Sequence, residues 1–291
     1  MIKQFKEFLN ESNHTHLTDE QVRFLNVCSG SSSWNYDTET GLVNINGSFD
    51  CSRRKLKNLL GIKFGEVTKS FDCEKNDLSS LEGSPRMIGG RFDCSDNQIT
   101  SLEGSPEEVT STFDCSGNLL VSLLGGPRKA GSYTCSYNKL TNLEGAPKEI
   151  TSYFSCSVNK LTSLKGSPEK VGSFTCSNND LTTLEGGPKF VTAGDYVCGN
   201  NELTSLEGCA QSIFGYLRCN DNNLESLSGK PDEVAGINFE GNPFYERVKP
   251  YLLKFEQNEK DMLYKMWELE PNKSDESFER IIRIIKRMSF M

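Results

Sequence analysis

A unit of 20 to 22 residues repeats in register along about two thirds of this 291-residue chain, and it constrains the fold more than any other feature. One unit, Phe92–Ser111, reads FDCSDNQITSLEGSPEEVTS. Because a single unit of this length cannot bury its own apolar edge, such repeats stack into a solenoid in which each coil contacts only its neighbours. A tenth, partial unit (Ile237–Phe244) has Phe239 where the nine full units have Cys51, Cys73, Cys94, Cys115, Cys135, Cys156, Cys176, Cys198 and Cys219.

Five other positions of the unit hold nearly the same residue type in every copy. An aromatic residue precedes the cysteine by two positions, an asparagine follows it by three, aliphatic residues follow by five and eight, and a glycine follows by ten. The aromatic residue and the cysteine alternate as in a strand with one buried face, so both are expected to point inward. The asparagine amide is expected to satisfy backbone groups of its own coil and of the next. The first unit departs from this pattern, with Arg54 in the asparagine position.

The string F-x-C-x-x-N-x-L resembles the core L-x-L-x-x-N-x-L of leucine-rich repeats, with Phe and Cys in the first two Leu positions. The segment after it, such as TSLEGSPEEV, resembles the variable convex part of short bacterial and phage leucine-rich repeats. The resemblance implies a leucine-rich-repeat solenoid over residues 48–242. It implies short parallel β-strands on the concave face, mostly irregular return segments, and caps at both ends.

The two ends carry different patterns. In residues 12–47, Thr18-Asp-Glu-Gln21 has the form of a capping box that starts a short helix through about Val27, and a hairpin pattern follows over Trp34–Phe49. These elements are expected to cover the open edge of the first coil. Residues 243–291 predict helices interrupted near Pro250 and a last helix over Ser274–Met288. The basic amphipathic face of that last helix is compatible with membrane or partner binding, or with packing as a C-terminal cap.

The first eleven residues, MIKQFKEFLNE, resemble the capsid-targeting peptide of internal head proteins in large contractile-tailed bacteriophages. Phe5, Glu7 and Phe8 match the body of that peptide, although Ile2 departs from its usual start. The resemblance implies cleavage by a prohead protease after Glu11. The alternative is a small amphipathic helix. Together with the repeat style, the peptide indicates a phage-encoded protein located in the bacterial host cytoplasm or in the virion.

Composition and charge exclude several classes of function. A formal net charge of −8 argues against general nucleic-acid binding and against adsorption to an anionic membrane. No apolar run approaches the ~18–20 residues of a membrane span. The periodic cysteines lack the short spacing of zinc ligands, and one cysteine per repeat indicates a buried packing residue. Buried free thiols are typical of a reducing compartment. With only His14 and His16, both outside the repeats, we expect no enzyme activity, no metal and no cofactor.

Surface recognition remains, and the outward residues near each cysteine are the candidate contact set. Toward the N-terminus they form an acidic group, consisting of Asp50, Asp72, Asp93, Asp114, Glu74 and Asp96. Toward the C-terminus they include interface-forming types, namely Tyr137, Tyr153, Tyr216 and Arg218. The acidic group is interpreted as a slot for a basic segment of a protein partner. The alternatives are a calcium site and a solvated face without a role.

These features predict a non-enzymatic protein-binding module that captures a host or phage protein on its concave face. The alternatives are a structural or internal virion protein processed after Glu11, and a secreted effector or adhesin. The oligomeric state is left open. Unit four, SGNLLVSLLGGP, has apolar residues at Leu119, Val121 and Leu124 where most units are polar, and these are either an exposed patch or buried under a neighbouring coil.

Overall fold

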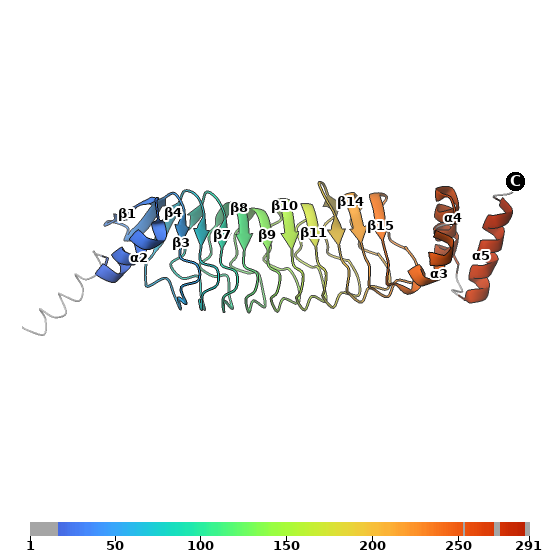
Figure 1. The fold of residues 1–291 in the computed structure, drawn as a ribbon, viewed down its shortest axis with the longest axis horizontal. Coiled ribbons are helices and arrows are strands. Elements are labelled where there is room, and N and C mark those ends of the chain that lie inside the picture. The colour runs from blue at the N-terminus through green and yellow to red at the C-terminus, as the bar shows by residue number, and fades with distance from the viewer. Residues whose placement is uncertain (1–16, 253, 271–273, 289–291) are drawn as a thin grey trace, which may run out of the picture.

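The computed structural model describes residues 17–252, 254–270 and 274–288, so the N-terminal peptide and the cleavage site predicted at Glu11 lie outside the described residues. The coils form an almost straight row with helices at both ends (Figure 1). Helix α2 (Asp19–Ser29) and the hairpin of β1 (Ser33–Asp37) and β2 (Leu42–Asn46) precede the coils, and α3 (Pro243–Leu252), α4 (Gln257–Glu268) and α5 (Asp275–Met288) follow them.

Each coil contributes to one parallel sheet, in which only β1 and β2 pair antiparallel among the described strands. In four coils the strand is divided in two: β2 with β3 (Phe49–Asp50), β4 (Phe64–Val67) with β5 (Phe71–Asp72), β6 (Met87–Ile88) with β7 (Phe92–Asp93), and β12 (Phe190–Val191) with β13 (Tyr196–Val197). The others have one strand each, namely β8 (Glu108–Asp114), β9 (Lys129–Thr134), β10 (Glu149–Ser155), β11 (Lys170–Thr175), β14 (Ser212–Arg218) and β15 (Glu233–Asn238).

The strands begin earlier than the sequence pattern indicates. The aliphatic residue that follows each Gly-x-Pro, such as Val109, was assigned to the convex part, but it lies in the first half of the strand and is buried. In β8 the register shifts between Val109 and Thr112, and Ser111, which strict alternation would turn inward with Val109 and Phe113, is exposed. Because the sequence does not mark the position of the bulge, period-two alternation predicts only the second half of the strand.

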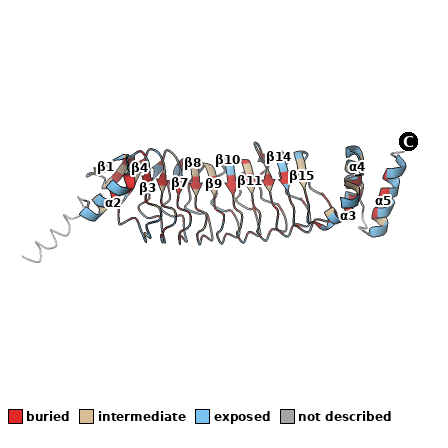
Figure 2. Ribbon diagram, in the orientation of Figure 1, coloured by how far each residue is buried: buried red, intermediate tan, exposed pale blue. Residues whose placement is uncertain are grey.

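The core is a set of ladders that repeat from coil to coil, and Figure 2 shows the recurring buried positions. Rings at the aromatic position lie 5.0 to 5.6 Å apart between successive coils from Phe49 to Tyr196. The nine repeat cysteines are fully buried beside them. Several thiols also donate to the next coil, as Cys73 Sγ does to the carbonyl oxygen of Asp93 at 3.2 Å. The cysteine ladder therefore serves packing.

The asparagine ladder links each coil to the one before it. Asn97 Nδ2 donates to the carbonyl oxygens of Cys94 in its own coil and Cys73 in the preceding coil, at 3.1 and 3.0 Å. Its Oδ1 accepts the backbone N–H of Leu78, also in the preceding coil. The expected partner was the next coil, so the direction of that prediction was wrong. The same direction explains Arg54, because the first full unit has no preceding cysteine carbonyl to bind.

The caps close both ends of the stack. Thr18 and Gln21 form the expected capping box at the start of α2, and β2 pairs in parallel with β4, so the hairpin extends the sheet. At the other end, Trp267 of α4 is buried, and its Nε1 donates to the Glu225 carbonyl of the ninth coil at 2.7 Å. Phe278 of α5 packs edge-on against that Trp267 ring. The fold class is confirmed as a leucine-rich-repeat solenoid with a helix and hairpin at one end and helices at the other.

Candidate functional site

The four aspartates before the cysteines lie side by side on the strand face, which is the outward surface of the coil strands and of the two residues after each cysteine. Their strands pair in register, so Asp50, Asp72, Asp93 and Asp114 are each opposite the next. In every case Oδ1 accepts the backbone N–H two residues further on, at 2.9 to 3.1 Å. These aspartates therefore also cap the turn after each strand, a structural role that the sequence pattern did not reveal.

Exposure differs along this row. Asp50 is exposed and Asp72 and Asp114 are half-buried, whereas Asp93 is only 1% exposed. Arg91 forms ion pairs with both Asp93 and Asp114. Burial raises the pKa of Asp93 and of Asp72, because it penalises the charged carboxylate and the neighbouring aspartates add like charge. Asp93 thus faces Arg91 in this structure, and the accessible carboxylates of the row are the other three.

The remaining acidic residues of this end are also paired. Glu74 Oε1 lies 2.7 Å from Arg53, and this hydrogen bond holds the pKa of Glu74 below its ordinary value. Lys75 Nζ lies 3.6 Å from Glu74 and 3.8 Å from Asp96. Four of the six carboxylates of the acidic group thus pair with three basic side chains, Arg53, Lys75 and Arg91, and the nine side chains together carry a charge of −3. The face is still acidic, but less so than the aspartate row alone indicates.

The middle coils present aromatic and aliphatic residues on a strained backbone position. The residue two positions after each cysteine has a positive φ in every coil, and Gly117 and Gly241 occupy it in two of them. Tyr137 and Val158 adopt φ of 57° and 56° there, although bulky and β-branched residues disfavour the left-handed region. Tyr137 is 64% exposed and Tyr153 38%. Because every coil has this φ, the turn of the repeat imposes it, and the middle coils differ only in the side chains that they carry there.

The best organised part of the strand face lies on the eighth and ninth coils, and we call it the coil-nine cluster (Asp195, Phe214, Tyr216 and Arg218). Asp195 accepts hydrogen bonds from the Tyr216 backbone N–H and from Arg218 Nε, both at 2.8 Å. These bonds, that of Tyr216 first, hold the pKa of Asp195 below its ordinary value. The Arg218 guanidinium carbon lies 5.5 Å from the centre of the Tyr216 ring, within cation–π range.

Two members of this cluster were missed by the sequence interpretation, which considered residues close to each cysteine. Phe214 is 72% exposed and lies on the outward side of β14 with Tyr216 and Arg218, so continuing the period-two alternation back along the strand would have found it. Asp195 could not be found in this way, since its role depends on the neighbouring coil. The Tyr216 ring also lies against Gly236, where a Cβ would be 2.9 Å from Cε1. The absence of a side chain at Gly236 therefore leaves room for the ring.

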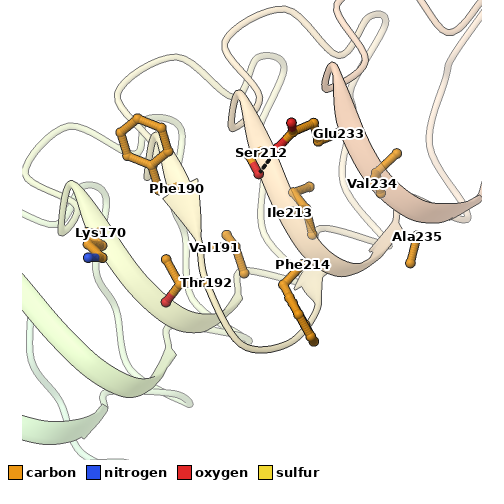
Figure 3. A pocket seen from close by; sticks show the side chains of 10 residues that line it. All are labelled: Lys170, Phe190, Val191, Thr192, Ser212, Ile213, Phe214, Glu233, Val234 and Ala235. Atoms are coloured by element: carbon orange, nitrogen blue, oxygen red, sulfur yellow. Dashed lines mark hydrogen bonds between the residues drawn. The ribbon is translucent and has the colours of Figure 1, made fainter.

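A shallow groove of about 690 Å³ adjoins the cluster, across the first halves of β11, β12, β14 and β15 (Figure 3). Phe190 and Phe214 are the exposed aromatic residues along it, at 40% and 72%. One polar contact crosses it, from Ser212 Oγ to Glu233 at 3.0 Å. The groove is lined by Lys170, Phe190, Val191, Thr192, Ser212, Ile213, Phe214, Glu233, Val234 and Ala235. An apolar floor beside aromatic side chains suits an extended or helical segment of another protein.

The chemistry available to the described residues is limited. Burial raises the pKa of the cysteine thiols, to about 11 for Cys28 and about 12 for Cys209, so they are protonated and weakly nucleophilic near neutral pH. Across residues 17–252, 254–270 and 274–288, no three His, Cys, Asp or Glu side chains are grouped so that they could hold a metal ion. Nor does any helix in those ranges combine the length and apolar content of a bilayer span.

No family model matches the sequence, and no curated protein matches it. Among solved structures, YopM from Yersinia enterocolitica WA-314 is similar, with a TM-score of 0.42 and 16% sequence identity over 81% of this chain and 73% of that chain.

Proposed function

We propose that this chain is a non-enzymatic leucine-rich-repeat module that binds another protein on its strand face, with the coil-nine cluster as the main anchor. The observation that carries the proposal is the prearranged group of Tyr216 and Arg218, fixed by Asp195 next to the exposed Phe214. Aromatic residues and arginine dominate binding energy at protein interfaces. Groups already held in place lose less conformational freedom when a partner binds.

The partner meets two different surfaces in this proposal. The coil-nine cluster and the adjoining groove supply buried contact area, and Tyr137 and Tyr153 extend it toward the middle coils. The acidic group attracts a basic segment of the same partner through Asp50, Asp72 and Asp114. Exposed charges act mainly on the association rate and are screened by salt, whereas buried aromatic contacts act mainly on dissociation.

The test begins with capture of a partner from a candidate host lysate on the immobilised full chain, followed by surface plasmon resonance with the purified partner. Phe214→Ala with Tyr216→Ala should speed dissociation by about tenfold for each 1.4 kcal/mol lost. Asp50→Asn with Asp114→Asn should slow association several-fold at low salt and have less effect at high salt. Asparagine is chosen because its Oδ1 can still accept the turn N–H. Glu202→Ala, an exposed residue four positions after Cys198 and outside the strand face, is the control.

Two outcomes would remove this proposal. One is a partner whose association and dissociation rates with both sets of variants equal those with the wild type and with the control Glu202→Ala. The other is a partner that binds equally well when the variants are misfolded, which circular dichroism would detect, since binding would then not require the solenoid.

We further propose that the protein is phage-encoded and acts in the bacterial cytoplasm or is carried in the virion. The sequence of residues 1–11 and the repeat style support this proposal. If the peptide is a targeting signal, the protein in mature particles should begin at Ser12, and N-terminal mass spectrometry of purified virions measures this directly. An intact Met1–Glu11 segment in mature particles would reject processing and leave the cytoplasmic role. Formation of disulfides between the repeat cysteines in cells would instead favour a secreted effector or adhesin.

A further inference from the structure

The apolar residues of the fourth coil are exposed, which decides a question that the sequence left open. Leu119, Val121 and Leu124 are 40%, 61% and 65% exposed. They occupy the positions four, six and nine residues after the cysteine, and we call the surface formed by these three positions in all coils the flank. It is distinct from the strand face. An apolar coil in a row of polar ones marks a contact surface, and its neighbours indicate what covers it.

In one row of the flank, charged residues that lie the same number of coils before and after the fourth coil have opposite signs. At the position four residues after the cysteine, the second coil has Asp77 and the sixth has Lys160, while the third has Gln98 and the fifth has Lys139. All of these side chains are exposed. Gln98 Nε2 reaches Asp77 in the adjacent coil at 3.5 Å, so equivalent positions form a continuous row. Two copies of this row that run in opposite directions, with Leu119 at the centre of both, would therefore place Asp77 of each copy opposite Lys160 of the other.

The pattern extends one coil further and appears in a second row. Lys55 of the first coil and Asp180 of the seventh are again opposite in sign. At the position nine residues after the cysteine, Glu82 of the second coil corresponds to Lys165 of the sixth. In this row Glu103 corresponds to Glu144, the one like-charge correspondence, and Leu60 corresponds to Glu185. Glu144 has Lys165 of its own copy at 2.7 Å. Between these rows, the position six residues after the cysteine is Ser or Thr in coils two to seven except at Val121, small enough for close approach, and it is Lys57 in the first coil.

We infer that the flank binds a second copy of this chain, antiparallel to the first, about a two-fold axis at the fourth coil. A two-fold axis in the interface and perpendicular to the row of coils brings coil two against coil six of the other copy and keeps each row facing its equivalent. Leu119, Val121 and Leu124 then meet themselves. A parallel arrangement would reverse the rows, and Asp77 would face Glu82 of the other copy, which is repulsive. The charge pattern thus selects one arrangement.

The expected interface is small. Seven coils at ~4.8 Å span ~34 Å, and five residue steps of ~3.3 Å span ~16 Å, which gives ~1,100 Å² in total for two copies. This is near the low end of specific interfaces. The dimer is therefore weak and sensitive to salt, and it leaves both strand faces free to bind partners.

Sedimentation velocity on the full chain tests the dimer, over concentrations of ~1 to 200 µM at low salt. The wild type should shift from monomer to dimer with increasing concentration. Leu124→Lys should raise the dissociation constant by about tenfold or more. Asp77→Lys and Lys160→Asp should each weaken the dimer, because each places like charges opposite each other. Glu202→Lys, in the same row but outside the seven coils, should have no effect.

The decisive measurement combines the two charge variants. The double variant Asp77→Lys with Lys160→Asp should dimerise again, and an equimolar mixture of the two single variants should form heterodimers, since both of its charge pairs are then opposite in sign. A wild type that stays monomeric over the whole range overturns the inference. So does a wild-type dimer that the single variants do not weaken, or a double variant that is not restored while its circular dichroism and melting temperature match the wild type.

Discussion

At the residue scale, most positions in the unit have one dominant partner, and that partner explains the residue type. Tyrosine replaces phenylalanine in the core only at Tyr133 and Tyr196. In both cases a glycine stands next to the hydroxyl, where a Cβ at Gly126 or Gly187 would lie 2.9 or 2.8 Å from it. In the other full units the equivalent position holds Ile, Ser, Ala, Cys or Lys, and the coil that follows has no tyrosine at the aromatic position. The larger ring therefore needs the smaller neighbour.

Asp93 gives a residue-scale prediction about pH. Its pKa is raised mainly by burial, so between the ordinary value of 3.8 and the raised value the folded chain binds more protons than the unfolded chain. The ionised carboxylate is thus a cost to folding that disappears as the pH falls. An asparagine side chain at this position would be neutral at every pH and could still accept the Ser95 N–H. Asp93→Asn should therefore be more stable than the wild type at pH 7, by ~1 kcal/mol.

Urea unfolding at pH 7 and near pH 4 measures this difference, which should shrink as the pH is lowered. Asp50→Asn, at the exposed end of the same row, is the control and should change stability little. An Asp93→Asn protein that is clearly less stable at pH 7 would show that the Arg91 ion pair outweighs the burial of the carboxylate.

At the element scale, the sequence predicts what lies within one unit better than what passes between units. The inward direction of the aromatic residue and the cysteine follows from period-two alternation, and the capping box at Thr18 is readable because its partners are three residues apart. The early start of each strand was missed, since the bulge between Val109 and Thr112 breaks that alternation. Asp195 was missed because its partners, Tyr216 and Arg218, lie 21 and 23 residues away. Contacts between coils require the stack, and a pattern within one unit does not contain them.

At the scale of the whole molecule, a solenoid depends on its ends, because every interior coil is covered by two neighbours and a terminal coil by one. The helices after Asn242 provide that second neighbour for the last coils. Trp267 is the centre of this cap. It contacts the ninth coil through the Glu225 carbonyl, packs against Phe278 of α5, and lies under the Arg247 guanidinium at 4.9 Å.

Weakening this cap should change how the stack unfolds. Trp267→Ala should cost about 3–5 kcal/mol, the range for removing a large buried aromatic side chain. Because coils contact only their neighbours, the loss should act locally. Native-state hydrogen exchange should show faster exchange for the amides of β14 and β15, with those of β5 and β7 unchanged. Trp267→Phe, which keeps a ring but not the hydrogen bond, should have a smaller effect in the same place. Equal acceleration in all coils would mean that the solenoid unfolds as one cooperative unit, and the cap would then stabilise the whole molecule rather than its last coils.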